Sequence, residues 1–106
     1  MVQRFDYLVI GSGIAGMSFA LKVANEGKSV ALICKAGQEE ANTYFAQGGI
    51  ASVTNLKVDN FEKHIEDTRI AGDWISDRAA VEKVVREAPA QIEALIRWGD
   101  NFDKKE

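Results

Sequence analysis

The sequence predicts an α/β fold that opens with a strand–helix–strand unit, and three observations support this prediction. A short β-branched and aromatic run ends at a glycine, a segment with helical spacing follows it, and a second continuous apolar run comes next. In such a unit the two strands are parallel and the crossover is right-handed. Residues 1–106 are expected to form one domain, because the chain shows no internal repeat, low-complexity tract or linker.

The first strand is expected at residues 5–10, whose sequence Phe-Asp-Tyr-Leu-Val-Ile is typical of a strand buried on both faces of a parallel sheet. Gly27 is placed to end the following helix, over residues 14–26, with a left-handed C-cap. That helix is predicted by apolar side chains that recur with helical spacing, at Ile14, Met17, Leu21 and Ala24. Residues 29–34 are again continuously apolar and complete the unit as its second strand.

The second half of the chain is predicted to be a long loop followed by two helices. Residues 35–51 lose all periodicity, and a loop of that length in a compact domain is commonly functional. After a brief extended stretch at residues 50–53, Asp59 and Glu62 resemble a capping box for a helix that runs to about Ala71, with Gly72 ending it.

The last helix is expected to begin at Ser76 or Asp77 and to run to Trp98. Its apolar stripe keeps helical spacing at Val81, Val84, Val85, Ala88, Ile92, Leu95 and Ile96. Pro89 is expected to bend or break this helix, because proline removes a backbone donor and clashes with the preceding turn.

Composition and charge exclude several classes of partner. The net charge is −3 and the basic residues are scattered, so the sequence favours neither a nucleic-acid partner nor binding to an anionic membrane. The apolar runs fall far short of the roughly 20 residues that a membrane helix needs. The single cysteine, Cys34, is typical of a small buried strand residue, and it favours a reducing, cytoplasmic location.

Residues 11–16, Gly-Ser-Gly-Ile-Ala-Gly, match the pattern G-x-G-x-x-G between the predicted strand and helix. Gly11 permits a sharp turn, Gly13 lets a pyrophosphate approach the backbone, and Gly16 lets helix and strand pack closely. Amides at the helix N-terminus then face the phosphate oxygens. The alternative is a glycine-rich turn without a ligand, and the position between strand and helix favours a dinucleotide.

The acidic residue that commonly holds the ribose hydroxyls at the end of the second strand is missing. Cys34 and Lys35 occupy that position. This argues against a plain NAD-binding module and leaves ribose recognition to backbone groups or to Lys35.

Residues 42–51, Asn-Thr-Tyr-Phe-Ala-Gln-Gly-Gly-Ile-Ala, resemble the second flavin-binding segment of the succinate dehydrogenase and fumarate reductase flavoprotein superfamily. Within that superfamily the L-aspartate oxidases are most similar, and the similarity continues through residues 64–72 and 76–81. The resemblance implies a partial Rossmann-like FAD-binding domain, truncated at this length, in which the strand–helix–strand unit precedes a long flavin-binding loop and then helices.

The resemblance also implies a noncovalently bound FAD. The implied cofactor-binding residues are Gly11, Ser12, Gly13, Ile14, Ala15 and Gly16 at the pyrophosphate, Lys35 near the adenosine, and Asn42, Thr43, Tyr44, Phe45, Ala46, Gln47, Gly48 and Gly49 beside the flavin. In the respiratory relatives a histidine at the position of Asn42 is joined covalently to the flavin, and asparagine cannot form that bond. Asn42 therefore favours the oxidase over succinate dehydrogenase.

By resemblance, the parent enzyme oxidises L-aspartate to iminoaspartate, with oxygen or fumarate as acceptor, in NAD biosynthesis, and quinolinate synthase would be its partner by pathway. Catalytic residues are expected beyond residue 106. The isolated chain is therefore expected to be inactive, to bind FAD weakly and to self-associate through its exposed strand edges. The alternatives are a fragment of a fumarate reductase or succinate dehydrogenase flavoprotein and a noncatalytic nucleotide-binding module.

The remaining conspicuous side chains have structural interpretations. Tyr44 and Phe45 are equally compatible with packing and with a place beside the flavin. His64 with its neighbouring carboxylates lacks a metal-ligand set, so no metal is expected. Packing is favoured for Trp74 and Trp98. Surface positions on helices, with a possible ion pair to Asp67 or Asp77, are favoured for Arg69, Arg78, Arg86 and Arg97.

Overall fold

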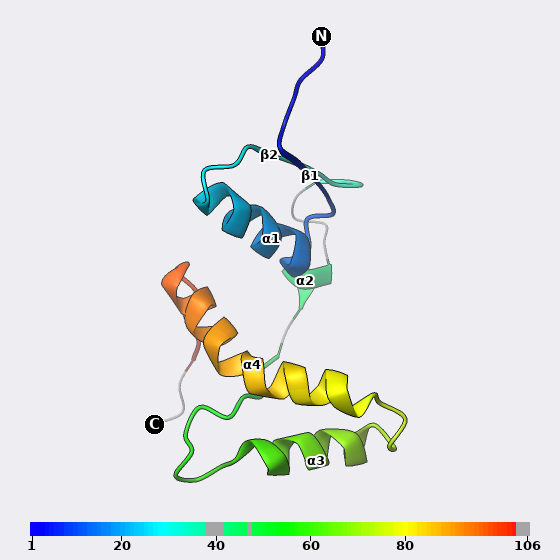
Figure 1. The fold of residues 1–106 in the computed structure, drawn as a ribbon, viewed down its shortest axis with the longest axis vertical. Helices are drawn as coiled ribbons and strands as arrows, with labels where there is room; N and C mark the ends of the chain where they lie inside the picture. Colours follow the sequence, from blue (N-terminus) through cyan, green and yellow to red (C-terminus); the bar gives the residue numbers. More distant parts are fainter. Residues whose placement is uncertain (38–41, 47, 104–106) are drawn as a thin grey trace. The chain divides into compact units, whose positions relative to one another are not determined.

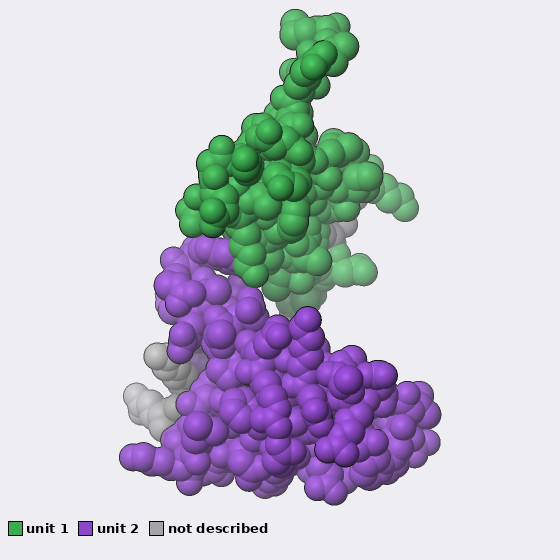
Figure 2. Space-filling view, in the orientation of Figure 1, with its two compact units in different colours: residues 1–49 green, residues 50–106 purple. Residues whose placement is uncertain are grey.

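The computed structural model describes residues 1–37, 42–46 and 48–103. Its elements, in the order shown in Figure 1, are β1 (Tyr7–Ile10), α1 (Ile14–Asn25), β2 (Val30–Ile33), α2 (Asn42–Phe45), α3 (Phe61–Ala71) and α4 (Arg78–Arg97). The chain divides into two compact units, Met1–Gly49 and Ile50–Glu106, which Figure 2 colours separately. The predicted α/β fold with its β–α–β opening is confirmed.

The first unit is a two-stranded parallel sheet with α1 packed against it. The strands pair in register from Tyr7 opposite Val30 to Ile10 opposite Ile33. Val9 is buried beneath α1, and the ring of Tyr7 meets the ring of Phe19 edge to face at 5.6 Å. These contacts place alternate β1 side chains on the α1 side, as the two-residue period of a strand requires.

The expectation that β1 is buried on both faces is wrong for this chain. Leu8 is 61% exposed and Ile10 is 79% exposed, because α1 covers the face that carries Tyr7 and Val9. The continuous apolar run correctly indicated a strand, but the covering of a second face depends on elements outside the run itself.

The end of α1 follows the prediction. Gly27 has a φ of +76°, its N–H donates to the carbonyl of Ala24, and the N–H of Lys28 donates to the carbonyl of Val23. This pair of bonds is the Schellman arrangement, which favours glycine at the left-handed position.

Asp6 and Ser29 tie together the beginnings of β1 and β2. The Asp6 carboxylate accepts hydrogen bonds from the Ser29 amide and the Ser29 hydroxyl, both at 2.8 Å. In return, the Asp6 amide donates to the Ser29 hydroxyl oxygen at 3.0 Å. The bonds from Ser29, helped by the charge of Lys28, lower the pKa of the Asp6 carboxyl.

Replacement of Asp6 with asparagine is expected to lower stability at neutral pH and to matter less in acid. The lowered pKa means that the folded protein favours the ionised carboxylate, so its stabilisation is complete above the ordinary pKa of an aspartate. This stabilisation is lost as the pH falls through the lowered pKa of Asp6 in the folded protein. Urea unfolding at pH 7 and at about pH 3 should show the wild type losing its advantage over Asp6→Asn. Asp100→Asn, outside both strands, is the control, and an advantage of equal size at both pH values would contradict the prediction.

The second unit is a pair of packed helices, α3 and α4, whose core includes Ile65 and Val85. The guanidinium of Arg86 on α4 forms an ion pair with the Glu62 carboxylate on α3 and lies 5.6 Å from the Phe61 ring. Because these groups are largely exposed, the ion pair adds little to stability.

The helix boundaries of this unit are close to those predicted, with one correction. The N-cap of α3 is Asn60, whose side chain accepts from the Lys63 amide at 2.8 Å, and not Asp59. Asp77 caps α4 by accepting from the Ala80 amide, which settles the choice between Ser76 and Asp77. Pro89 lies inside α4 without ending it, and Figure 1 shows α4 changing direction along its length, as a proline bend requires.

Residues 50–53, predicted to be extended, form no strand in the described part of the chain, although Val53 is 2% exposed and so belongs to the core. Gly72 ends α3 as predicted, and the turn after it has two non-glycine residues at positive φ, Asp73 and Trp74. The guanidinium of Arg69 lies 4.7 Å from the Trp74 ring. Trp74 is therefore held by a cation–π contact and is half exposed.

Candidate functional site

Gly11 turns the chain out of β1 and into the glycine loop. Its amide donates to the Ile33 carbonyl at 2.8 Å, which continues the parallel ladder for one residue past the strand. Its φ is +111°, a region that side chains rarely adopt, although the space around it is open. Glycine is required here by backbone conformation.

Gly16 is required by packing. A Cβ atom at this position would lie 2.1 Å from the carbonyl oxygen of Gly11 and 3.1 Å from Cγ1 of Val9. Helix α1 can therefore cross β1 at this distance only because residue 16 has no side chain.

Gly13 has neither of these internal reasons to be glycine. Its φ of −72° and ψ of 175° suit any residue, and a Cβ atom would meet only Thr43 Oγ1, at an ordinary contact distance of 3.6 Å. The bare backbone at Gly13 thus leaves an open approach to the first turn of α1. A group that lies outside the described residues and must come close to the backbone would account for a glycine there.

The first turn of α1 suits an anion. Gly13 is the N-cap and provides no side-chain cap, and the first turn contains no acidic residue that would repel negative charge. The first-turn amides and the helix dipole therefore favour an anion such as a phosphate at this end. Ser12, which precedes the cap, is 8% exposed.

The second predicted motif meets the first at this point. Residues 42–45 form the short helix α2 inside the predicted loop, and Thr43 Oγ1 accepts a hydrogen bond of 3.1 Å from the Ile14 amide. These residues are 29 positions apart in sequence. Sequence reasoning singled out both residues but missed their contact. The sequence shows that the N-cap, Gly13, offers no side-chain acceptor, but it does not indicate which residue supplies one.

Tyr44 and Phe45 do not enter a core in the described part of the chain. They are 62% and 67% exposed, and their rings pack edge to face with centroids 5.3 Å apart. Asn42, Ala46, Gly48 and Gly49 are also exposed, whereas Gln47 lies outside the described residues. The described residues provide no core for these rings, and both interpretations of Tyr44 and Phe45 stay predictions.

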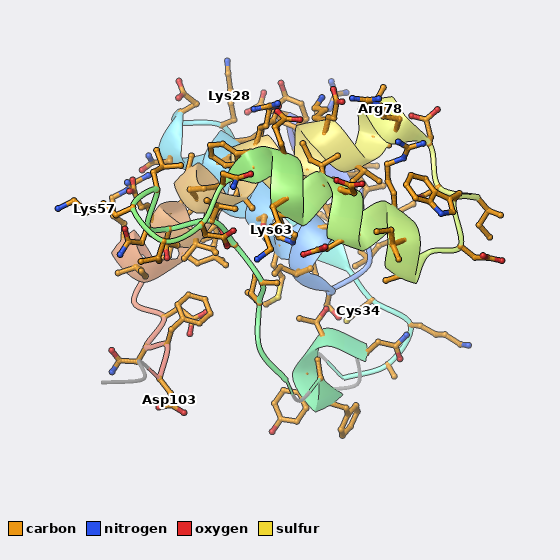
Figure 3. The ribbon with its side chains drawn as sticks, turned by 90° about the horizontal axis from the view of Figure 1, so that it is seen from below. Lys28, Cys34, Lys57, Lys63, Arg78 and Asp103 are labelled. Carbon is orange, nitrogen blue, oxygen red and sulfur yellow. The ribbon has the colours of Figure 1, made fainter. Side chains whose placement is uncertain are left out.

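Cys34 and Lys35 lie just beyond β2, and both are exposed. The Cys34 thiol, labelled in Figure 3, donates to the Ala36 carbonyl at 2.9 Å. The expectation that Cys34 is buried is wrong, because β2 ends at Ile33 and the chain leaves the sheet there. No carboxylate directly follows β2 in the sequence, where Cys34 and Lys35 stand.

The other side chains considered from sequence lie in the second unit, residues 50–106. His64 lines a largely apolar cavity of about 310 Å³ between α3 and α4, and no cluster that could hold a metal is found among the residues that the structure describes. In the described part of the chain, three arginines form ion pairs with glutamates and not with Asp67 or Asp77: Arg78 with Glu82, Arg86 with Glu62, and Arg97 with Glu93. The hydrogen bond that the Arg78 guanidinium donates to the Glu82 carboxylate raises the pKa of Arg78.

Comparison with known families gives one match over nearly the whole chain. Residues 6–106 match the family described as FAD binding domain. L-aspartate oxidase 2-a, chloroplastic, from Nicotiana tabacum is 46% identical over 104 residues, which are 98% of this chain and 16% of the relative. L-aspartate oxidase from Vibrio cholerae is also 46% identical over 104 residues, which are 19% of that protein.

Two solved structures share the fold of the chain. The FrdA chain of a mutant E. coli quinol fumarate reductase superposes with a TM-score of 0.80 at 32% identity, over 95% of this chain and 17% of the other. The Sdh1 complex of Mycobacterium smegmatis in its apo form superposes with a TM-score of 0.81 at 30% identity, over 96% and 18%. The chain thus spans less than a fifth of the proteins that it matches.

Proposed function

The chain belongs to the FAD binding domain family, and on that premise we propose that it forms part of the FAD-binding domain of an L-aspartate oxidase. Relatives of that name match 98% of the chain, at 43–46% identity in plants and 46% in Vibrio cholerae. FAD is the cofactor of the family and agrees with the dinucleotide expected from the glycine loop.

The observation that carries this proposal is the bare backbone at Gly13. It is the one position of the G-x-G-x-x-G pattern where neither backbone conformation nor packing inside the chain asks for glycine. A diphosphate approaching the first turn of α1 supplies the missing reason. In the proposed site Gly11 to Gly16 receive the diphosphate, Lys35 lies towards the adenosine, and Asn42 to Gly49 lie beside the flavin.

The bound FAD would supply the acceptor for a hydride from the substrate. The residues of this chain would hold the cofactor: amides of the first turn of α1 donate to the diphosphate, and the exposed rings of Tyr44 and Phe45 offer apolar surface to the flavin. For the whole protein we propose oxidation of L-aspartate to iminoaspartate, with oxygen or fumarate as acceptor. That product belongs to NAD biosynthesis, which makes quinolinate synthase the proposed pathway partner.

A fumarate reductase or succinate dehydrogenase flavoprotein is the second candidate, because both structural neighbours are of that kind. Asn42 argues against it, since an amide side chain cannot replace the histidine that carries a covalent flavin. We therefore propose noncovalent binding.

The proposed location is the cytoplasm in a bacterial source, whereas the plant relatives are named chloroplastic. None of the helices within the described ranges is both long enough and apolar enough to cross a bilayer.

The proposal predicts that the protein expressed from its complete reading frame binds one FAD and that L-aspartate, but not succinate, bleaches the flavin absorbance under anaerobic conditions. Because Asn42 cannot bond covalently to the ring, denaturation should release all of the flavin into the supernatant. Bleaching by succinate with flavin retained on the denatured chain would favour the second candidate. A protein without flavin affinity would refute both.

A further inference from the structure

Helix α1 begins without a cap from its own N-cap residue. Most helices place serine, threonine, aspartate or asparagine there, so that a side-chain oxygen accepts from a first-turn amide. Gly13 offers no such oxygen. Any of the usual capping side chains at this position would also stand in the open approach to the backbone. An acceptor for a first-turn amide must therefore come from another residue or from a ligand.

Thr43 provides that acceptor from the neighbouring α2. Its hydroxyl oxygen receives the Ile14 amide at 3.1 Å. The same oxygen lies 3.6 Å from the place where a Cβ of Gly13 would stand, so the hydroxyl lies beside the bare backbone itself. A hydroxyl that accepts one hydrogen bond still has its own proton to donate.

We propose that Thr43 is a remote cap that couples α2 to the diphosphate site, so that a diphosphate bound at the first turn of α1 also fixes α2 in place. This inference rests on the proposed function. The Ile14 amide donates to the Thr43 hydroxyl, and the hydroxyl proton donates to a phosphate oxygen. Hydrogen bonds in such a series strengthen one another, so occupancy of the site by an anion strengthens the contact that holds α2.

The dependence of α2 on this contact follows from its size and exposure. It has four residues, far fewer than a helix needs to be stable on its own, and each of them is exposed. Its described contact with α1 is the Thr43 hydroxyl bond. The position of Tyr44 and Phe45 is thus set by a group that responds to the diphosphate, before any flavin ring is present.

The test uses ADP, which carries the diphosphate without the flavin, and hydrogen exchange of the peptide containing residues 42–46. In the protein from the complete reading frame, ADP should slow this exchange about tenfold, which corresponds to one charge-assisted hydrogen bond. Thr43→Ser keeps the hydroxyl and should behave like the wild type. Thr43→Val keeps the shape, loses the hydroxyl, and should show no slowing and about tenfold weaker binding of ADP.

Several outcomes would overturn the inference. Equal slowing by ADP in Thr43→Val would show that the hydroxyl is not the link, and loss of slowing in Thr43→Ser would show that something other than the hydroxyl matters. Thr43→Ala gives the same comparison if valine disturbs folding, which exchange of the β1 amides reports. A wild type that binds no FAD would overturn the proposed function as well. A wild type that binds FAD, with a normal ADP response in Thr43→Val, would overturn this inference alone.

Discussion

Replacing Gly16 with alanine is expected to destabilise the protein by about 3 kcal/mol, the upper part of the usual range for overpacking a tight contact. The new Cβ would lie 2.1 Å from the Gly11 carbonyl oxygen, which is a backbone atom and cannot rotate away. Helix α1 and strand β1 would have to separate, and Val9 would lose its cover. In an ordinary helix interior, replacing glycine with alanine stabilises the helix by about 1 kcal/mol. A loss of stability in Gly16→Ala would therefore come from the steric clash.

Urea unfolding of the protein from the complete reading frame measures this loss, with Gly37→Ala as the matched control. A Cβ at Gly37 would meet nothing within 4 Å, and Gly37 is not among the glycines with a positive φ. Its substitution should leave the unfolding midpoint nearly unchanged. A Gly16→Ala variant as stable as Gly37→Ala would mean that α1 does not approach β1 as closely as described.

The β–α–β unit was predictable because its signals are local. The change from a continuous apolar run to helical spacing, with Gly11 and Gly27 at the boundaries, needs no knowledge of the rest of the molecule. The error at the start of α3 is of the same local kind: Asp59 and Asn60 are both good capping residues, and the side-chain bond to Lys63 decides between them. Burial of both faces of β1 was not predictable, because Leu8 and Ile10 need a partner that the strand itself does not specify.

The glycine loop was predictable in position, and the structure separates the reasons for its three glycines. Glycine is needed at position 11 because of its positive φ and at position 16 because α1 packs closely against β1, as expected from the pattern. The bond between Ile14 and Thr43 was not predictable, because it joins residues 29 positions apart through a loop without periodicity. The four residues of α2 are likewise too few to give a helical pattern that could be recognised.

Replacing Gly13 with alanine is expected to separate binding from stability. The protein from the complete reading frame should unfold within about 1 kcal/mol of the wild type, because φ and ψ suit alanine and the nearest atom to the new methyl is 3.6 Å away. Affinity for FAD should fall about 100-fold. The methyl would stand between the diphosphate and the first-turn amides, and loss of charge-assisted hydrogen bonds costs about 1.5–3 kcal/mol.

Fluorescence titration with FAD measures the affinity of Gly13→Ala, and urea unfolding measures its free energy of unfolding. Gly16→Ala is measured in the same way for comparison. Gly16→Ala should lose affinity and stability together, since the fold that positions the amides is itself disturbed. Gly13→Ala should lose affinity alone, because its methyl meets a ligand and not the chain. Wild-type affinity in Gly13→Ala would mean that the diphosphate does not approach the backbone at this residue. Ligand binding would then not explain the glycine at position 13, and the proposed function would lose its main supporting observation.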